Sequence, residues 1–397
     1  MRILFISSSS GSRGGGELYL IYLGKELAKR GFTVGLWCSA NPNMDELANL
    51  FAEFGQVLRS PYKNTYNLKF RSLEYIFINK DQNYKNIISQ WQEFKPDIIH
   101  LNKQNLEDGL DLLDWINHLS IPSVTTIHIT QTQATLGAFL GFFRDIIAKS
   151  ALKKYHHHIV AISENRGIEL KKIIQEQNLT LSKIKVINNG VYVPETTERL
   201  KKRELSRSQM KLNPENLLII AVGRMEEQKQ PLLFLQWANY LRQHISSVRF
   251  LWVGDGRLNS LWDQWVLGNN AQEYIQRIGW QNDVTPFLAA ADVFFHPAAF
   301  EGLPFALLEA MAWYLPCVIT SDLANELKFP SDSYFVISTD NRFEELNKLL
   351  TPEAINTVSD TGYHLIKNKF SLNKMVNNYI SLYQDSQILF NSQLRNI

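Results

Sequence analysis

The segment 299–322, AFEGLPFALLEAMAWYLPCVITSD, constrains the possible folds of this chain more than any other stretch. It follows an apolar strand expected at 293–296 and begins with a loop that carries Glu301. Pro304 is expected to open an almost wholly apolar helix, because a proline at a first helical position leaves no backbone bond unmade. A second strand is expected at 317–320. Strand, loop, helix and strand in this order predict part of an α/β fold with a parallel sheet.

Two carboxylates, Glu301 and Glu309, lie eight positions apart across the start of this helix. A helix N-terminus, here around Phe305 and Ala306, offers unpaired N–H groups and a partial positive charge, which favour a phosphate group. A carboxylate on an apolar helix needs hydrogen-bond donors if it is buried, and sugar hydroxyls would provide them. The spacing equally allows a plainer interpretation, in which Glu309 faces solvent and Glu301 is only a loop charge.

The Glu-x7-Glu spacing and the sequence EGLPFALLEAMA resemble the signature of retaining glycosyltransferases of family 4 (GT4). The resemblance extends over most of the chain. It implies a GT-B fold, an α/β architecture in which two Rossmann-like domains with parallel sheets face each other across a cleft. It also implies a nucleoside-diphosphate sugar as donor, with Glu301 orienting the sugar and Glu309 binding the ribose hydroxyls.

A glycine-rich loop, SSGSRGGGE, connects an apolar strand expected at 2–8 to a helix, and such a turn suits a phosphate. It matches neither common phosphate-binding signature, since Tyr19 stands where G-x-G-x-x-G needs glycine and Glu17 where a P-loop needs lysine. The loop therefore argues against NAD binding and ATP hydrolysis. Its glycines could serve only to permit a tight turn. In GT4 relatives the matching pair, Gly15 and Gly16 here, approaches the diphosphate or the acceptor.

Two cations lie at and beyond the end of the apolar strand expected at 217–224. Arg224 ends the strand next to Gly223, and Lys229 precedes a helix that starts at Pro231. Arginine binds phosphate through a planar fork of donors and lysine as a point charge. They would supply the positive charge that the first glycine-rich loop lacks. Exposed cations are commonly just solvated, but the same G-R-x4-K pattern in GT4 enzymes clamps the diphosphate, and the resemblance implies that role here.

His128 ends the strand expected at 122–128, and ligands collect at the carboxyl ends of parallel strands. A lone histidine is commonly structural, but GT4 relatives carry a histidine at this strand end that approaches the donor sugar. Gly254, in the glycine turn after a further strand, is also a candidate for donor binding. The resemblance implies that the backbone of Gly279 and Trp280 lies beside the base.

The chain departs from the GT4 pattern at 320–328, where the usual Gly-Gly pair before a glutamate is replaced by Asp-Leu-Ala-Asn-Glu. Tyr192 also stands where relatives usually have aspartate. The first departure motivates a second hypothesis, a non-catalytic nucleotide-sugar-binding protein or partner subunit with the same fold. A third, an NAD-dependent oxidoreductase or epimerase, is disfavoured by the failed G-x-G-x-x-G match.

A chain of 397 residues is longer than a single hydrophobic core usually accommodates, which suggests two domains. We expect an N-terminal Rossmann-like domain on the acceptor side at 1–193, and a polar linker with a short helix and the domain boundary at 194–214. The donor domain is expected at 215–375. The GT-B resemblance implies that an amphipathic helix at 376–397 crosses back to the first domain.

The net charge of +2 and the 45% hydrophobic content are typical of a globular protein and give no sign of a nucleic-acid partner. Cys38 and Cys317 fall in different predicted domains, so a disulfide is not expected and a reducing compartment fits. The N-terminus lacks the features of a signal peptide. No uninterrupted apolar run is long enough to span a membrane. These features together predict a cytoplasmic protein.

Residues 136–156, LGAFLGFFRDIIAKSALKKYH, are apolar and basic, which is compatible with an interfacial helix touching a membrane. A core helix with a basic outer edge is the preferred interpretation of the two. The three consecutive histidines at 156–158 cannot share one helix face, which argues against a metal site there.

The favoured hypothesis is a retaining glycosyltransferase that moves a sugar from a UDP- or GDP-sugar to a glycan, lipid or other small acceptor. His128, Arg224, Lys229 and Glu301 are the catalytic candidates, acting by positioning and by neutralising the leaving diphosphate. The chain has no Asp-x-Asp motif, and the resemblance implies no obligatory metal; no cofactor is expected. Peripheral contact of the N-terminal domain with the inner face of a membrane stays open.

Overall fold

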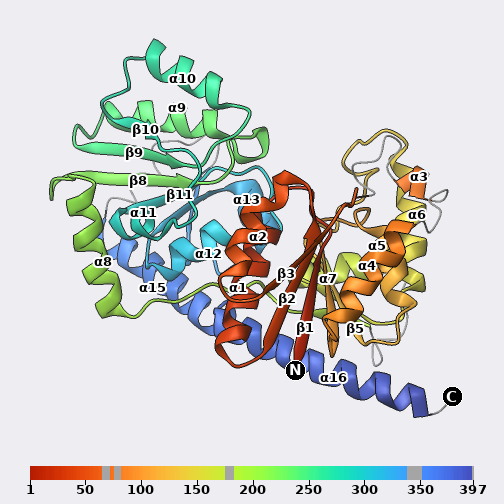
Figure 1. Ribbon diagram of the computed structural model, residues 1–397. Helices are drawn as coiled ribbons and strands as arrows, with labels where there is room; N and C mark the ends of the chain where they lie inside the picture. The colour runs from red at the N-terminus through yellow and green to blue at the C-terminus, as the bar shows by residue number, and fades with distance from the viewer. Residues whose placement is uncertain (65–71, 76–81, 175–182, 338–350, 396–397) are drawn as a thin grey trace. The chain divides into compact units, whose positions relative to one another are not determined.

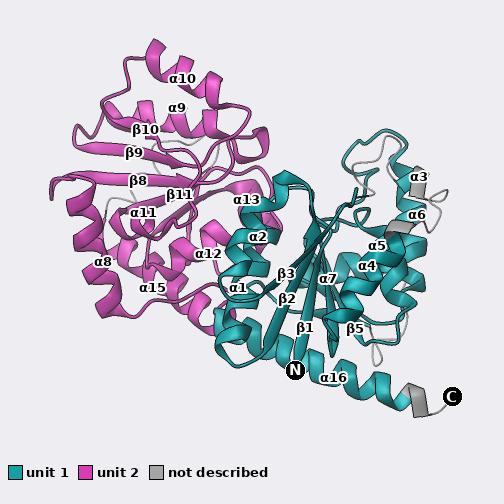
Figure 2. Cartoon of the chain, in the orientation of Figure 1, with its two compact units in different colours: residues 1–189, 372–397 teal, residues 190–371 magenta. Residues whose placement is uncertain are grey.

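The computed structural model describes residues 1–64, 72–75, 82–174, 183–337 and 351–395 (Figure 1). Its chain forms two compact units, one made of residues 1–189 and 372–397, the other of residues 190–371 (Figure 2). We call them unit 1 and unit 2. Each is built on a sheet whose strands all pair in parallel, joined by helices. The prediction of two Rossmann-like domains is confirmed.

The sheet of unit 1 has seven strands in the order β3-β2-β1-β4-β5-β6-β7. These strands are β1 (Arg2–Ser7), β2 (Thr33–Ser39), β3 (Gln56–Ser60), β4 (Ile98–Lys103), β5 (Ser123–Ile127), β6 (His158–Ala161) and β7 (Ile184–Val186). The central β4 is buried along its whole length even though it carries His100, Asn102 and Lys103, whereas the neighbouring β1 is mostly apolar, as expected in a parallel sheet. Strand β3 was not predicted, because this edge strand is mostly only half-buried and has no apolar run.

Helices connect these strands and cover the sheet (Figure 1). They are α1 (Gly15–Lys29), α2 (Asp45–Ala52), α3 (Ser72–Tyr75), α4 (Gln82–Glu93), α5 (Leu110–Asn117), α6 (Gly141–Lys154), α7 (Glu164–Ile174) and α16 (Leu372–Arg395), with the 3-10 turn η1 (Pro42–Met44). Within the part of the chain that the structure describes, no helix combines the length and apolarity needed to cross a membrane.

The last helix of the chain, α16, belongs to unit 1 and packs against α1 and β5. The Arg30 guanidinium at the end of α1 donates to the amide oxygens of Asn373 and Asn377, both at 2.6 Å. The Tyr383 hydroxyl is hydrogen-bonded to Nδ1 of His100 on β4 at 2.5 Å. Unit 1 is therefore completed by a segment that is remote from it in sequence.

The sheet of unit 2 has six strands in the order β10-β9-β8-β11-β12-β13. These strands are β8 (Leu217–Val222), β9 (Val248–Val253), β10 (Ile275–Arg277), β11 (Val293–His296), β12 (Cys317–Thr320) and β13 (Phe335–Ile337). The helices are α8 (Thr196–Gln209), α9 (Pro231–Arg242), α10 (Asn259–Gly268), α11 (Thr285–Ala290), α12 (Phe305–Ala312), α13 (Ser321–Leu327) and α15 (Pro352–Lys369), with the 3-10 turn η3 (Glu227–Lys229). Strands β11 and β12 have the bounds that the sequence predicts.

Helix α8 occupies most of the stretch 194–214 that the sequence suggested as a linker, and it lies within unit 2. It packs against α11 through charged side chains. Arg203 and Arg207 both form ion pairs with Asp292, and the carboxylate of Asp292 also accepts the backbone N–H of Leu218 at 2.7 Å. The many charged residues of α8 made this stretch look like a solvated linker in the sequence. In the structure, two of them, Arg203 and Arg207, attach the helix to the rest of unit 2.

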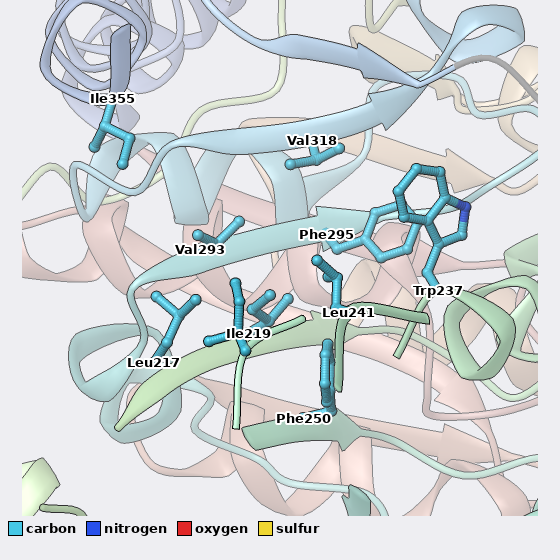
Figure 3. A pocket seen from close by; sticks show the side chains of 10 residues that line it. Leu217, Ile219, Trp237, Leu241, Phe250, Val293, Phe295, Val318 and Ile355 are labelled. Carbon is cyan, nitrogen blue, oxygen red and sulfur yellow. The ribbon is translucent and has the colours of Figure 1, made fainter. Parts of the chain in front are cut away.

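An apolar cavity of about 60 Å³ lies on one face of the unit 2 sheet (Figure 3). Its lining side chains come mainly from β8, β9, β11, β12 and α9, and all are apolar: Leu217, Ile219, Trp237, Leu241, Ile245, Phe250, Val293, Phe295, Val318 and Ile355. A sugar nucleotide needs polar partners, so this cavity is a packing feature of the core rather than a donor site.

Replacing Asp292 by alanine is expected to destabilise unit 2, because two guanidinium groups and one strand amide lose their shared acceptor. We expect the free energy of unfolding to fall by about 2–3 kcal/mol. Thermal and urea unfolding would measure the change. Asp332→Ala, which removes an exposed acid of the same unit, is the matched control and should change stability little. Equal effects of the two substitutions would contradict the docking role of Asp292.

Candidate active site

The loops after neighbouring strands of unit 2 meet at the carboxyl edge of its sheet, where ligands of α/β proteins collect. The N–H of Gly254, after β9, donates to the carbonyl of Gly279, after β10, at 2.8 Å. Gly254 has a φ of +136°, and a Cβ there would overlap the carbonyl oxygen of Gly223, after β8. Glycine at 254 therefore lets three loops approach closely. These are three of the glycines proposed from the sequence.

Lys229, the last residue of η3, forms an ion pair with Glu301, in the loop after β11. The two segments are also joined through Gln228: its carbonyl accepts the N–H of Ala299 at 2.9 Å, and its side-chain amide donates to the carbonyl of Phe300 at 2.9 Å. The structure thus brings together two predicted site residues that are 72 positions apart.

The electrostatics around Lys229 favour an anionic ligand. Burial, with a further contribution from the nearby Arg224 guanidinium, lowers the pKa of Lys229 to about 7. The contact with the Glu301 carboxylate acts in the opposite sense and favours the charged ammonium. Arg224 itself is exposed. An anion bound beside both cations would relieve their mutual repulsion.

His296, which the sequence analysis did not single out, is the last residue of β11 and is buried. Its Nε2 lies 3.6 Å from Oε1 of Glu301 and, among the described residues, has no hydrogen-bond partner. Burial and the charge of Lys229 lower the pKa of His296, so the ring is neutral at pH 7. Its place at a strand end five residues before Glu301 is the signal that could have identified it.

The unusual segment 320–328 forms the helix α13 instead of a glycine loop. The Thr320 hydroxyl caps this helix by accepting the N–H of Leu323 at 3.3 Å. Glu326, in the last turn, accepts the backbone N–H of Glu301 at 2.8 Å. An acid within the departure from the GT4 pattern therefore holds the loop that carries Glu301.

The remaining candidates of unit 2 lie on α12 and in the segment after β10. Helix α12 begins at Phe305, four residues after Glu301, and its first turn includes Ala306. Pro304 is the N-cap, with extended backbone, and not the first helical residue. Glu309 lies one turn beyond Phe305 and is partly exposed. The Trp280 indole, also partly exposed, donates to the side chain of Asn282 at 3.0 Å.

Three candidates lie in unit 1: His128, Gly15 and Gly16. His128 directly follows β5 and is buried, and its Nε2 lies 2.7 Å from Oδ1 of Asn102. The other side-chain atom of Asn102, Nδ2, donates to the carbonyl of Gly16 at 3.2 Å. Nε2 of His128 must therefore carry the hydrogen. Burial lowers the pKa of His128 to about 3, so the ring is neutral and Nδ1 can accept a hydroxyl hydrogen.

Only part of the glycine-rich segment of unit 1 is packed against protein side chains: a Cβ at Gly11 would meet no other atom among the described residues, whereas Gly16, in α1, is buried. A Cβ at Gly16 would overlap the amide of Gln104, which donates to Glu17 and to Ser9, both at 2.8 Å. Gly15, the first residue of α1, is exposed. Close packing accounts for a glycine at 16, and the roles of both glycines toward a diphosphate or acceptor stay predictions.

No group of three or more histidine, cysteine, aspartate or glutamate side chains suited to a metal ion occurs among the residues that the structure describes. Cys38 and Cys317 are both buried free thiols.

Two family models match the chain. Residues 13–193 match the model described as Glycosyltransferase Family 4, and residues 216–350 match Glycosyl transferases group 1. A curated relative from Escherichia coli, UDP-Gal:alpha-D-GlcNAc-diphosphoundecaprenol alpha-1,3-galactosyltransferase, is 31% identical over 53% of this chain and 57% of its own length. The putative glycosyltransferase EpsF of Bacillus subtilis is 22% identical over 43% of each chain. The chain thus spans only about half the length of these curated relatives.

Solved structures share the fold over nearly the whole chain. HepE of Anabaena, solved in complex with UDP, has a TM-score of 0.72 at 16% identity and covers 97% of this chain and 100% of its own. Sucrose-phosphate synthase of Thermosynechococcus elongatus has a TM-score of 0.70 at 16% identity and covers 99% and 100%. One family match falls almost wholly in unit 1 and the other in unit 2, and together they span most of the described sequence. This chain belongs to the GT4-type glycosyltransferases of group 1, with the GT-B fold.

Proposed function

We propose that this protein is a retaining glycosyltransferase that takes a sugar from a nucleoside-diphosphate sugar, with UDP as the favoured nucleotide. The observation that carries the proposal is the pairing of Lys229 with Glu301 beside Arg224 at the carboxyl edge of the unit 2 sheet. A cation pair and an acid at one strand edge match the two chemical halves of such a donor, an anionic diphosphate and a sugar rich in hydroxyls.

The diphosphate would be held by Arg224, Lys229 and the first-turn N–H groups of α12. On binding, the Lys229 ammonium would turn from Glu301 toward phosphate oxygens. Glu301 would then be available to accept hydrogen bonds from sugar hydroxyls. The apposed glycines 223, 254 and 279 lower the steric barrier to a nucleotide at this edge, because no side chain projects from them.

Two further contacts complete the proposal. Glu309 would accept hydrogen bonds from the ribose hydroxyls. His128 would accept one from a sugar hydroxyl through Nδ1, in keeping with its neutral state and the tautomer fixed by Asn102. Both roles are carried over from the GT4 resemblance and stay predictions.

In the proposed reaction the bond between the anomeric carbon and the diphosphate oxygen breaks while an acceptor hydroxyl bonds to that carbon on the same face. The acceptor's proton passes to the departing diphosphate. Arg224 and Lys229 would stabilise the charge that develops on the leaving group, which needs no cofactor and no obligatory metal. Positioning of donor and acceptor would supply much of the remaining acceleration.

The acceptor is proposed to be a glycan or a lipid-linked glycan. The E. coli relative bears a name that specifies a UDP-galactose donor and a diphosphoundecaprenol-linked acceptor. An acceptor of that kind resides in a membrane, so we propose a cytoplasmic protein with peripheral contact at the inner face of the membrane.

A donor panel tests the proposal. The protein is mixed with UDP-glucose, UDP-galactose, UDP-N-acetylglucosamine and GDP-mannose, and both the shift of the unfolding temperature and the release of nucleoside diphosphate are measured. We expect one donor to stabilise the protein and to be slowly hydrolysed or transferred. Stabilisation by a donor that is never hydrolysed, with or without acceptor glycans, would favour the non-catalytic binder instead.

Replacing Lys229 by alanine is expected to weaken the binding of UDP by about 10–100-fold, because one charge-assisted contact to the diphosphate is lost. Isothermal titration calorimetry would measure the dissociation constant, and circular dichroism would check that the fold is intact. Lys369→Ala, which removes an exposed lysine at the end of α15 in the same unit, is the matched control. An unchanged dissociation constant for Lys229→Ala would refute the phosphate role.

The lowered pKa of Lys229, about 7, makes donor binding depend on pH. Below this pKa the amine is charged and binds the diphosphate; above it the amine is neutral. The affinity for UDP-glucose, whose phosphates keep constant charge, should therefore fall by about tenfold or more between about pH 6 and pH 9. Lys229→Arg should flatten this dependence, since arginine stays charged. Equal pH dependence of the two proteins would show that another group titrates.

A further inference from the structure

The first half of α6 has its polarity reversed relative to an ordinary surface helix. Its charged pair, Arg144 and Asp145, is buried, whereas Phe142, Phe143 and Ile146 are 66%, 57% and 48% exposed. Surface helices normally bury the apolar side chains and expose the charges. An exposed apolar face that is matched by buried charges indicates a surface with a partner.

The loop before α6 continues this apolar surface. Phe139 is 82% exposed, and Leu136 and Leu140 are also exposed. We define the exposed side chains at 136, 139, 140, 142, 143 and 146 as the 136–146 patch. The rings of Phe142 and Phe143 contact each other edge to face, with centroids 5.7 Å apart.

The buried charges of α6 hold this loop in place. The Asp145 carboxylate accepts the backbone N–H groups of Gln133 and Ala134 at 2.7 and 3.0 Å, and Arg144 donates to the carbonyl of Phe139 at 3.1 Å. These bonds hold the loop before α6 against the first turn of the helix. Hydrogen bonds within unit 1 therefore keep the side chains of the patch exposed.

A buried ion pair anchors the same helix to the interior of unit 1. The Arg144 guanidinium donates to both carboxylate oxygens of Glu107, at 2.8 and 2.5 Å. Glu107 is fully buried and also accepts the N–H and the hydroxyl of Ser72, at 3.0 and 2.7 Å. Bidentate pairing of this kind is geometrically specific and keeps the reversed orientation of α6.

The charge on the outer side of α6 is entirely basic. Lys149, Lys153 and Lys154 follow the patch along the helix, and helical spacing places Lys149 and Lys153 on the side of Ile146. The single acid of the helix, Asp145, is buried. Apolar side chains that lead into lysines suit a surface that is apolar inside and anionic outside.

We propose that the 136–146 patch inserts into the interface of an anionic lipid bilayer, with the lysines of α6 on the lipid phosphates. This inference deepens the membrane contact of the proposed function by assigning it to a surface. It rests on the surface alone and requires no particular donor or acceptor. It also replaces our preferred sequence interpretation, since the outward face of 136–146 is apolar.

The test uses the full-length protein and flotation with two kinds of vesicles: phosphatidylethanolamine with about 30% phosphatidylglycerol, and phosphatidylcholine alone. We expect binding to the anionic vesicles and much weaker binding to the neutral ones. The double substitution Phe142→Ser/Phe143→Ser should reduce the anionic partition coefficient by about 10–100-fold. Lys149→Glu/Lys153→Glu should remove the preference for anionic lipid.

Leu267→Ser is the matched control, because it removes an exposed leucine of α10 in unit 2 and should leave flotation unchanged. Unfolding temperature and UDP affinity, measured for every variant, show whether each is folded. Loss of flotation with intact UDP binding supports the patch independently of the transfer reaction. The proposal is overturned if the wild-type protein does not float. It is also overturned if the phenylalanine variant floats like wild type, or if the patch instead mediates a dimer that the same variant dissociates in the absence of lipid.

Discussion

The ion pair between Lys229 and Glu301 is the interaction on which the candidate site depends. It joins the loop after β8 to the loop after β11, and Gln228 repeats the connection through two further hydrogen bonds. Because β8 and β11 are parallel neighbours, both loops leave the sheet at the same edge. Burial and the nearby Arg224 guanidinium lower the pKa of Lys229, whereas its contact with the Glu301 carboxylate favours the charged ammonium.

Two further features hold the loops that carry Lys229 and Glu301: close backbone packing of neighbouring loops, and the helix α13. The glycines after β8, β9 and β10 stack their loops closely, and glycine is required where a Cβ at 254 would overlap the carbonyl of residue 223. On the other side, Glu326 of α13 accepts the N–H of Glu301. Where the family pattern has a Gly-Gly pair, this chain thus has a capped helix whose Glu326 holds the loop that carries Glu301.

Unit 1 uses charge differently. There the buried ion pair of Arg144 and Glu107 holds α6 and its preceding loop in place, while apolar side chains of α6 are exposed. Near His128, a single buried side chain likewise makes two hydrogen bonds. Asn102 accepts from Nε2 of His128, which sets the tautomer of the ring, and donates to the carbonyl of Gly16. In both places buried polar groups select one geometry, which is the specificity that a satisfied network provides.

The sequence alone determined the parallel α/β character of both halves, because mostly apolar strand segments alternate with helical segments along the chain. It also determined the bounds of β11 and β12 around the Glu-x7-Glu helix. Lys229 and Glu301 became candidates through their places after predicted strands and through the resemblance to the GT4 pattern, and the structure brings these two side chains together. The sequence did not identify β3, His296, Glu326 or the docking of α8, since an edge strand, a lone histidine and scattered charges have no period. Only the tertiary structure decided which face of α6 is apolar, because whether Arg144 and Asp145 are buried depends on partners remote in sequence such as Glu107.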